Sequence, residues 1–573
     1  MAIITTNPAN CKDCYRCVRS CPVKAIRIHR GHAEVVAERC ILDGECVRVC
    51  PQHAKVVKTD LAQVRAWLDR GEEVVASLAP SFVSVLDATF GQMTEALHRL
   101  GFVAVEETAL AAKSVAEEHR RILAHADRPV IGSSCPTIVN LVERYYPHLV
   151  PLLAPVVSPM IAHAMALRSR LGDQVRVVFI GPCLAKIAER EREGIAQWVD
   201  AVITFNDLFV LLKDQSINPP NLIGANTPAM EIGAARLFPL GGGMLKAASL
   251  SSDLVAEQTL SATGLAECMA VLDQLDTSSP SAPVLIELLA CPGGCINGPG
   301  HTGASSTLQR RQRVLAYAGV KGDESPKVPR PANPGEESGQ LSCSFTPKPI
   351  GAIEPNEEQI HEILASIGKI GPEDELNCGA CGYSSCRAKA IAVFHGMAER
   401  EMCMPYMRQQ AESMANLIIQ ASPDGVVVVD RQLRIVEINP SFASMFACQR
   451  ERVAGRLIGE FMDPEPFLQT FATQESMHLD LTVPSYGLIF RGTLFYVAHQ
   501  GVVIALLDNM TQEVMQQREL DQVRSETLEK AQEVINKQMR VAQEIAGLLG
   551  ETTAETKVLL TKLMRVMRGE GGA

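Results

Sequence analysis

Residues 285–300 read LIELLACPGGCINGPG, an apolar run that leads into two cysteines, Cys291 and Cys295, and a glycine-rich turn. Two earlier apolar runs, RVVFIGPC and VIGSSC, also lead into a cysteine, Cys183 and Cys135 respectively. Short apolar runs bounded by glycine and proline indicate buried strands, and the longer periodic segments between them indicate helices. This part of the chain is therefore predicted to be an α/β domain with cysteines in the loops that follow its strands.

The three cysteine loops resemble, in order and spacing, the signature loops of the iron-iron hydrogenases, whose usual forms are TSCCPxW, MPCxxKxxE and ExMACxxGCxxGG. The resemblance covers residues 72–317 and implies an iron-hydrogenase catalytic α/β domain. It also implies an H-cluster, a 4Fe-4S cubane joined through a bridging thiolate to a two-iron unit. The implied ligands are Cys135, Cys183, Cys291 and the bridging Cys295. Lys186 matches the lysine that donates to a cyanide ligand, and Glu189 matches the motif's glutamate.

The resemblance breaks down where protons are delivered. Ser134 replaces the cysteine before the first ligand, and a hydroxyl is a much weaker acid than a thiol, whose pKa lies near 8.5. Glu118 matches one glutamate of the usual proton relay, but Arg121 follows three residues later and keeps its proton at neutral pH. Gly181 and Leu289 stand where two methionines normally pack. These changes predict low turnover; neutral drift within a working enzyme is the alternative.

The first cysteine cluster has the spacing of a bacterial ferredoxin. A C-x2-C-x2-C-x3-C-P run is followed by a second run in which Asp43 replaces one cysteine. In two-cluster ferredoxins the fourth cysteine of each run serves the other cluster. Residues 1–58 are therefore predicted to be a ferredoxin-like domain with two 4Fe-4S clusters. One cluster is assigned to Cys11, Cys14, Cys17 and Cys50, and the other to Cys21, Cys40, Asp43 and Cys46.

Asp43 leaves three possibilities open. Its carboxylate could ligate iron as a harder donor than thiolate, water could complete the site, or the cluster could contain three irons. We favour the carboxylate. A pair of structural zinc sites is an alternative for the whole segment, but it needs two C-x2-C knuckles rather than seven thiolates in this register.

A second iron-sulfur domain is predicted after a linker. Residues 318–356 contain GDESPKVPRPANPGEESG and predict an exposed linker. Residues 357–411 resemble the four-cysteine iron-sulfur domain of several anaerobic redox proteins, with a zinc knuckle as the alternative. The predicted ligands of its 4Fe-4S cluster are Cys378, Cys381, Cys386 and Cys403. Three cysteines without partners at ligand spacing are expected to be ordinary thiols: Cys268, Cys343 and Cys448.

The C-terminal part resembles a signalling module. Residues 412–512 look like a PAS domain, with a strand, an Asp-Arg-Gln turn, a second strand ending at Asn439 and then short helices. No motif in it indicates a bound cofactor. Residues 513–573 predict helices with a short heptad seam that includes Leu528 and Ile535 and a break near Gly550. We expect a homodimer through the PAS domain and this helix; a helix packed on its own domain is the alternative.

Composition narrows the class of protein. The chain has 573 residues, 47% hydrophobic and 21% charged, with a formal net charge of −11 and 18 cysteines. This excludes wholesale disorder, and the lack of a basic surplus argues against nucleic-acid binding. No run approaches the roughly 18 apolar residues of a membrane span, and the start does not resemble a signal peptide. We expect a cytoplasmic protein, where clustered cysteines are more often metal ligands than disulfides.

Together these features predict a multidomain α+β and α/β protein that acts as a sensory iron-iron hydrogenase. It would react slowly with H2 and protons, register the electrons in its clusters, and signal through the PAS domain to a separate effector such as a kinase or phosphatase. One alternative is a catalytic hydrogenase that exchanges electrons with ferredoxin, another carrier or a partner dehydrogenase. Another is a redox scaffold that never receives the two-iron unit.

Overall fold

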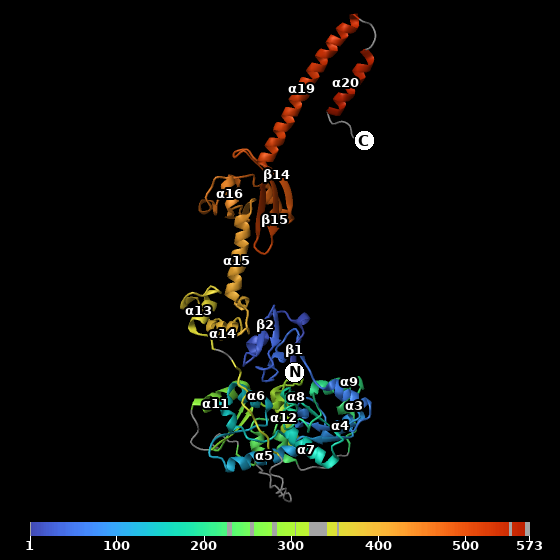
Figure 1. The fold of residues 1–573 in the computed structure, drawn as a ribbon, viewed down its shortest axis with the longest axis vertical. Coiled ribbons are helices and arrows are strands. Elements are labelled where there is room, and N and C mark those ends of the chain that lie inside the picture. Colours follow the sequence, from blue (N-terminus) through green and yellow to red (C-terminus); the bar gives the residue numbers. More distant parts are fainter. Residues whose placement is uncertain are drawn as a thin grey trace. The chain divides into compact units, whose positions relative to one another are not determined.

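The computed structural model divides into two compact units, Met1–Tyr406 and Met407–Ala573 (Figure 1). The described residues are 2–225, 232–251, 257–277, 283–303, 305–319, 341–351, 354–548 and 553–567. Most of the predicted linker and the predicted break at Gly550 lie outside these residues. Among the described helices, none has both the length and the apolar character needed to cross a membrane.

The N-terminal domain consists of two small antiparallel pairs of strands and two short helices. Strand β1 (Ile4–Thr6) pairs with β4 (Lys55–Val57), and β2 (Ile26–His29) pairs with β3 (His32–Val35). Helix α1 (Arg16–Ser20) begins after Tyr15 and α2 (Glu45–Arg48) begins after Gly44, and both of these preceding residues have left-handed backbone conformations. The left-handed residues turn the chain sharply, so that each cysteine run wraps around a small volume instead of extending.

The central domain has two parallel sheets, which confirms the predicted α/β pattern. The four-stranded sheet has the order β6-β5-β8-β9 and the three-stranded sheet the order β10-β11-β7. The strands are β5 (Val74–Leu78), β6 (Ala104–Glu107), β7 (Val130–Ile131), β8 (Arg176–Gly181), β9 (Ala201–Thr204), β10 (Thr259–Thr263) and β11 (Leu285–Leu289). Strands β5 and β11 are buried along their whole length, as expected for parallel strands covered on both faces.

Ten helices accompany these strands in the described part of the domain. They are α3 (Leu61–Asp69), α4 (Phe90–Arg99), α5 (Ala109–Ala124), α6 (Pro136–Tyr145), α7 (Pro159–Leu171), α8 (Ala185–Glu189), α9 (Phe205–Asp214), α10 (Gly243–Ala247), α11 (Leu265–Thr277) and α12 (Thr307–Ala318). Helices α4, α9 and α12 begin with capping boxes at Thr89, Thr204 and Ser306, which satisfy backbone donors at the helix starts.

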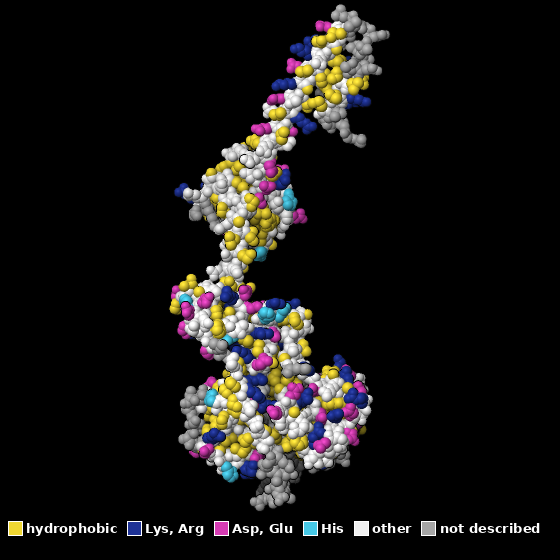
Figure 2. Space-filling view, in the orientation of Figure 1, with side chains coloured by type: hydrophobic (Ala, Val, Ile, Leu, Met, Phe, Trp, Pro, Cys, Tyr) yellow, Lys and Arg dark blue, Asp and Glu magenta, His cyan; other side chains and the backbone are white. Residues whose placement is uncertain are grey.

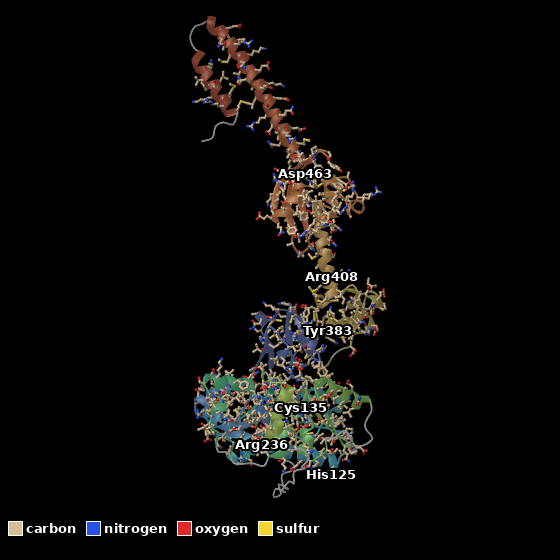
Figure 3. The ribbon with its side chains drawn as sticks, turned by 180° about the vertical axis from the view of Figure 1, so that it is seen from behind. His125, Cys135, Arg236, Tyr383, Arg408 and Asp463 are labelled. Atoms are coloured by element: carbon tan, nitrogen blue, oxygen red, sulfur yellow. The ribbon has the colours of Figure 1, made fainter. Side chains whose placement is uncertain are left out.

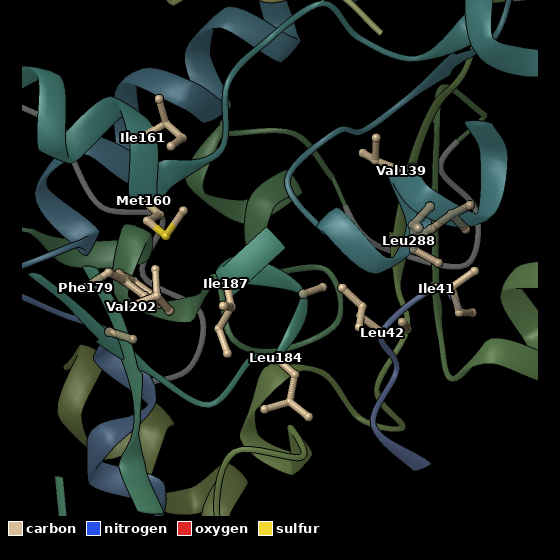
Figure 4. Packing of buried hydrophobic residues seen from close by; sticks show 14 of the residues in the cluster. Ile41, Leu42, Val139, Met160, Ile161, Phe179, Leu184, Ile187, Val202 and Leu288 are labelled. Atoms are coloured by element: carbon tan, nitrogen blue, oxygen red, sulfur yellow. The ribbon is translucent and has the colours of Figure 1, made fainter. Parts of the chain in front are cut away.

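The ferredoxin-like domain shares a hydrophobic core with the central domain. Ile41 and Leu42, from the loop before Asp43, are buried in the same cluster as Leu184 and Val139 (Figure 4). Burying such side chains contributes about 1.5–3 kcal/mol each. The two domains are therefore fixed against each other by packing and not only by the chain that joins them.

Part of the predicted linker also packs on the central domain. The backbone N–H of Cys343 donates to the carbonyl of Pro155 at 3.1 Å, and that of Lys348 donates to the carbonyl of Glu143 at 2.7 Å. Arg192 lies over the ring of Phe345, 5.6 Å from its centroid. In this part of the predicted linker, half-buried residues such as Cys343 and Phe345 alternate with exposed ones such as Ser344, so its exposed character is only partial.

The four-cysteine domain completes the first unit. Helices α13 (Glu357–Ala365) and α14 (Cys386–Phe394) pack through Ile360, Leu364 and Ala390. The chain then enters α15 (Met404–Ala421), which runs on into the second unit.

The second unit contains a five-stranded antiparallel sheet of order β13-β12-β16-β15-β14. Its strands are β12 (Gly425–Val429), β13 (Ile435–Ile438), β14 (Met477–Val483), β15 (Leu488–Val497) and β16 (Val502–Asn509), and its helices are α16 (Pro440–Met445), α17 (Arg450–Val453) and α18 (Glu465–Thr473). The side chain of Asn439 accepts from the N–H groups of Val426 and Phe442. It thereby joins β12 to α16 at the point where the sequence predicts a strand to end.

Two helices follow the sheet, α19 (Thr511–Leu548) and α20 (Thr553–Met567), and they contact each other. The predicted seam residues Leu528, Ala531 and Ile535 are half-buried, which agrees in part with the alternative of a helix packed within its own chain. Other apolar residues of α19 remain exposed, and acidic and basic side chains alternate along the helix (Figure 2). These exposed residues include Leu520, Val523, Val534 and Val541.

A glycine at the contact between the ferredoxin-like and central domains gives a test of this packing. Gly44 has a φ of +74°, and a Cβ added there would lie 2.6 Å from Cγ of Pro299 and 3.0 Å from Leu184. Gly31 has a similar φ of +72°, but its added Cβ would meet only Asp13, at 3.9 Å. Both Gly→Ala changes introduce backbone strain of about 1 kcal/mol. Gly44→Ala adds overpacking of about 1–3 kcal/mol.

We therefore expect Gly44→Ala to lower the free energy of unfolding more than Gly31→Ala does, and to make the junction near residue 59 easier to cleave. Chemical denaturation of the full chain and limited proteolysis would measure these two effects. Equal losses in the two variants would contradict the close contact at Pro299.

Candidate metal centres

The four cysteines of the hydrogenase-like motifs follow strands of both parallel sheets. Cys135 follows β7 and stands at the N-cap of α6, Cys183 follows β8, and Cys291 follows β11. Cys295 opens a short 3-10 turn four residues later. The carboxyl ends of parallel strands are the usual place for a site in such folds, and here two sheets contribute to it. Figure 3 labels Cys135 within the central domain.

The ionisation of these thiols shows that they share one buried environment. The pKa of Cys183 is raised to about 11. Burial is the largest cause, and the charge of Cys135 is the next largest. Burial also raises the pKa of Cys295 strongly, and Cys135 and Cys183 add to the effect; the pKa of Cys291 rises for the same reasons. Four thiolates this close repel one another unless cations neutralise them. The donor set therefore suits an iron cluster, whose binding releases the thiol protons.

A buried ion pair lies beside these cysteines. Nζ of Lys186 donates to Oε2 of Glu189 at 2.7 Å, and both side chains are about nine-tenths buried. The positive charge of Lys186 lowers the pKa of Cys183 and of Cys295, so it faces the same site. Glu189 holds the ammonium group in place. The two residues that the second motif singles out are thus brought together on α8.

Ser134 has a partner that the sequence did not reveal. Its Oγ lies 3.7 Å from Sδ of Met244, to which it donates. Met244 belongs to α10 and is buried, and its backbone N–H donates to the carboxylate of Glu287 at 2.8 Å. No motif spacing connects positions so far apart in the chain, so only the fold could find this thioether.

The two positions that lack the usual methionines are filled in different ways. A Cβ at Gly181 would lie 2.6 Å from the ring of Phe179, so this ring occupies the space of a larger side chain. Leu289 is buried at the end of β11. An aromatic ring and a leucine thus stand where the family motifs specify methionines.

The predicted proton relay is not assembled as a chain of hydrogen bonds. Glu118 on α5 is paired with Arg121, and its described hydrogen bonds do not run to Ser134. The neighbouring His119 is fully buried, and its Nε2 accepts from the backbone N–H of Ser133 at 3.4 Å. His119 therefore contacts the cysteine loop, although the sequence gave no reason to select it.

The N-terminal cysteines form two groups that match the crossed assignment. One cavity is lined by Cys11, Cys14, Cys17 and Cys50. Burial raises the pKa of Cys21 to about 12, with further contributions from Asp43 and Cys40. The pKa of Cys46 is raised by burial and then by Asp43, Cys40 and Cys21. Asp43 thus shares the second site with three thiols, and burial raises its own pKa to about 6.

The third group is in the four-cysteine domain. Its cavity is lined by four cysteines, together with Lys389 and Tyr383. Gly379 and Gly382 have φ values of +67° and +94°, and these left-handed conformations turn the loop tightly around the cavity. The four cysteines are Cys378, Cys381, Cys386 and Cys403. Within the described ranges, no three His, Cys, Asp or Glu side chains converge as the ligands of a single metal ion would.

The remaining three thiols lie away from these groups of cysteines along the chain. Cys268 is fully buried on α11, with its Sγ 3.5 Å from the carbonyl of Leu289. Cys343 is half-buried, and Cys448 is half-buried in the second unit.

Comparisons with protein families match each of these regions. The family described as iron only hydrogenase large subunit, C-terminal domain, matches residues 72–299. A 4Fe-4S dicluster domain matches residues 3–51, a putative Fe-S cluster domain matches residues 374–405, and the PAS fold matches residues 413–482. The chain therefore contains an iron-only hydrogenase domain, iron-sulfur domains on both sides of it, and a PAS domain.

Individual relatives are distant. The chain is 26% identical over 451 residues to the NADP-reducing hydrogenase subunit HndD of Solidesulfovibrio fructosivorans, covering 63% of this chain and 74% of that protein. It is 24% identical over 369 residues to the cytosolic Fe-S cluster assembly factor NAR1 of Yarrowia lipolytica, covering 48% of this chain and 74% of that protein. A solved FeFe-hydrogenase from Chlamydomonas reinhardtii is 20% identical with a TM-score of 0.42, covering 51% of this chain and 100% of that one.

The cysteine groups predict the iron content. Three accessory cubanes and a six-iron H-cluster amount to about eighteen iron atoms per chain after maturation, and protein without the two-iron unit should contain about sixteen. Infrared spectroscopy should show carbonyl and cyanide bands in the matured protein alone. Stoichiometric zinc in the N-terminal or four-cysteine domain would contradict the cubane assignment there.

Asp43 is predicted to ligate iron, which should make its cluster easy to convert to a three-iron form. Asp43→Cys replaces the hard carboxylate with a thiolate and should suppress that conversion. Paramagnetic resonance during mild oxidation would measure it, with Glu45→Cys on the neighbouring α2 as a control for adding a thiol nearby. The assignment fails if wild type and Asp43→Cys show the same cluster type and the same lability.

Proposed function

Because the chain carries an iron-only hydrogenase domain between iron-sulfur domains and is followed by a PAS domain, we propose that it is a sensory iron-iron hydrogenase. It reacts slowly with H2 at an H-cluster and passes the resulting redox state through its clusters and PAS domain to a separate effector. The observation that carries this proposal is the continuity at Cys403. This cluster ligand is followed at once by α15, the helix that leads into the PAS-containing unit.

The residues around the H-cluster site support binding of the two-iron unit. When bound, that unit supplies the metal centre at which H2 is split or formed. Cys135, Cys183, Cys291 and Cys295 hold the group. The ammonium group of Lys186 is held in place by Glu189, so that it can bind an anionic ligand in a buried place. A protein that bound only a cubane would have no need for this buried cation, which argues against the scaffold alternative.

The residues that would deliver protons to the site support low turnover. The hydroxyl of Ser134 donates to Met244, so its hydrogen is directed at a thioether, which is a weak acceptor and no proton carrier. Glu118 is held by Arg121, which remains protonated at neutral pH. A proton must therefore leave through a weak acid or through water. A sensor tolerates this slow step because it only needs to equilibrate with H2 over the time of regulation.

Two of the relatives correspond to the two alternative functions. HndD is a subunit of an NADP-reducing hydrogenase, which favours a catalytic role with a ferredoxin, another electron carrier or a partner dehydrogenase. NAR1 is an Fe-S cluster assembly factor, which favours a protein without the two-iron unit. The PAS domain and the serine at position 134 favour the sensory role over both.

The proposed setting follows from the same features. Thiol ligands in several exposed loops call for a reducing compartment, so we place the protein in the cytoplasm. The exposed apolar residues of α19 suit a homodimer formed through the PAS domain and this helix. The effector is a separate protein, such as a kinase or phosphatase.

The Ser134→Cys variant tests the slow step. A thiol is a better-matched acid beside the two-iron unit, and general acid-base contributions reach about 10² to 10⁴-fold, so even partial repair should raise hydrogen evolution more than about tenfold. Evolution driven by a reduced dye in matured protein would measure the gain. Ser133→Cys is the matched control, since the Ser133 hydroxyl donates to the carbonyl of Val156 at 2.7 Å.

Two results would overturn the sensory proposal. One is a wild-type rate already on the order of thousands per second, which is the range of a fast catalytic enzyme. The other is an unchanged rate in Ser134→Cys. Either result would favour the metabolic role.

A further inference from the structure

The cysteine loop of the four-cysteine domain is joined to the ferredoxin-like domain by a single arginine. The guanidinium of Arg19 donates to the carbonyl of Ala380 at 3.1 Å and to the carbonyl of Cys14 at 3.0 Å. Ala380 lies directly before Cys381, and Cys14 is a predicted ligand of the first N-terminal cluster. One side chain therefore connects two loops that surround different clusters.

The same loop lies directly on α1. A Cβ added at Gly382 would be 3.1 Å from Cγ1 of Val18 and 3.2 Å from the backbone N of Arg19. Helix α1 carries Cys17 and is followed by Cys21, so each N-terminal cluster has a ligand at this helix. The contact leaves no room for a side chain between the two cysteine-bearing segments.

A buried tyrosine, Tyr383, directly follows this loop. It lines the cavity of the four-cysteine domain, is only 5% exposed, and has no hydrogen-bond partner for its buried hydroxyl among the described residues. Cys381 and Cys21 both lie within electrostatic range of its hydroxyl. The ring therefore lies near thiols of both sites, where the four-cysteine domain meets the ferredoxin-like domain (Figure 3).

Further contacts hold the two domains together away from the cysteines. The N–H of Ile28 donates to the carbonyl of Met397 at 3.1 Å, and the N–H of Arg30 donates to the carboxylate of Glu399 at 2.6 Å. Met397 and Met402 are buried in the hydrophobic cluster that includes the ferredoxin-like domain. The two domains therefore contact each other through hydrogen bonds and apolar packing as well as through the cysteine loop.

We propose that this junction is an electron-transfer contact between the cluster at Cys378, Cys381, Cys386 and Cys403 and the cluster at Cys21, Cys40, Asp43 and Cys46. One electron passes in each event: a 4Fe-4S cluster in the 1+ state is oxidised to 2+ while its partner is reduced from 2+ to 1+. No bond forms or breaks and no proton moves. Electron tunnelling falls steeply with distance, and loops in van der Waals contact keep the distance short.

The proposal goes beyond the reaction with H2, because it concerns the accessory clusters alone and does not require the two-iron unit. It gives the four-cysteine domain a definite task, which is to take the electron that α15 and the PAS domain report. A purely structural domain would also bury Met397 and Met402, but it would not need a cysteine loop seated on α1.

The test uses the full chain with reconstituted accessory clusters, without maturation, reduced by dithionite. Pulsed paramagnetic resonance measures the magnetic dipolar coupling between the reduced clusters. We expect a coupling that disappears in the Cys378→Ala, Cys381→Ala double variant, whose iron content should fall by about four atoms as the cubane is lost. If the N-terminal signals have the same line shape with and without the third cluster, the contact is wrong.

Docking variants separate electron transfer from folding. Arg19→Ala and Glu399→Ala remove hydrogen bonds across the junction but no ligand, and Arg27→Ala is the control, because Arg27 pairs with Glu34 on the ferredoxin-like surface. After a pulse of limiting reductant, electron equilibration between the two clusters, followed by rapid-freeze resonance, should slow at least tenfold in the docking variants at unchanged iron content. Should Arg19→Ala lose iron, Glu399→Ala decides the question. An unchanged rate would overturn the proposal.

Discussion

Helix α6 is the element on which both ends of the hydrogenase-like site depend. Its first position directly follows Cys135, which stands at the N-cap of the helix. Near its other end, Asn140, Arg144 and Tyr145 donate to the carbonyls of Ile41, Cys40 and Arg39 in the ferredoxin-like domain. One helix thus links Cys135, a predicted cubane ligand, to the loop that carries Cys40 and Asp43. A shift in either loop would be transmitted along about 15 Å of helix.

The same helix also anchors the segment that leads to the four-cysteine domain. The carboxylate of Glu143 is 1% exposed and pairs with Arg192 and Lys348. A buried carboxylate with two cationic partners is costly to disrupt, since the loss of one partner of a buried pair typically costs about 3–5 kcal/mol. Helix α6 therefore organises three parts of the first unit.

The sequence predicts those features of the fold and of the site whose pattern lies in neighbouring residues. Cysteine spacing is local, and it predicted which thiols the fold gathers, including the exchange of Cys21 and Cys50 between the two N-terminal sites. The apolar runs before Cys183 and Cys291 likewise predicted β8 and β11. Met244 could not be found in this way, because its contact with Ser134 spans 110 positions and follows no repeating pattern.

The same reasoning explains the other places where the structure differs from the predictions made from the sequence. The predicted linker is rich in proline, glycine and charge in its first part, but the side chains of Leu341 and Phe345 near its end are apolar, and the central domain supplies a surface for them. The pairing of Glu118 with Arg121 is a local i,i+3 contact. The sequence indicated only that Arg121 would interrupt a proton relay. Composition describes a segment, whereas partners elsewhere in the fold decide whether it is exposed.

The position of Asp43 connects these observations. Its neighbour Gly44 packs against Pro299, four residues beyond Cys295, and the Cys21 that shares its site lies within electrostatic range of Tyr383. The predicted site of the unusual ligand therefore has neighbours in both the central domain and the four-cysteine domain. A carboxylate oxygen is a hard donor that favours the more oxidised iron, so it lowers the potential of the cluster it joins. A cluster of lower potential accepts electrons reluctantly, which limits flux but preserves the equilibrium between its neighbours. A metabolic enzyme would lose rate at this point, whereas a sensor, which reports an equilibrium, would lose only time.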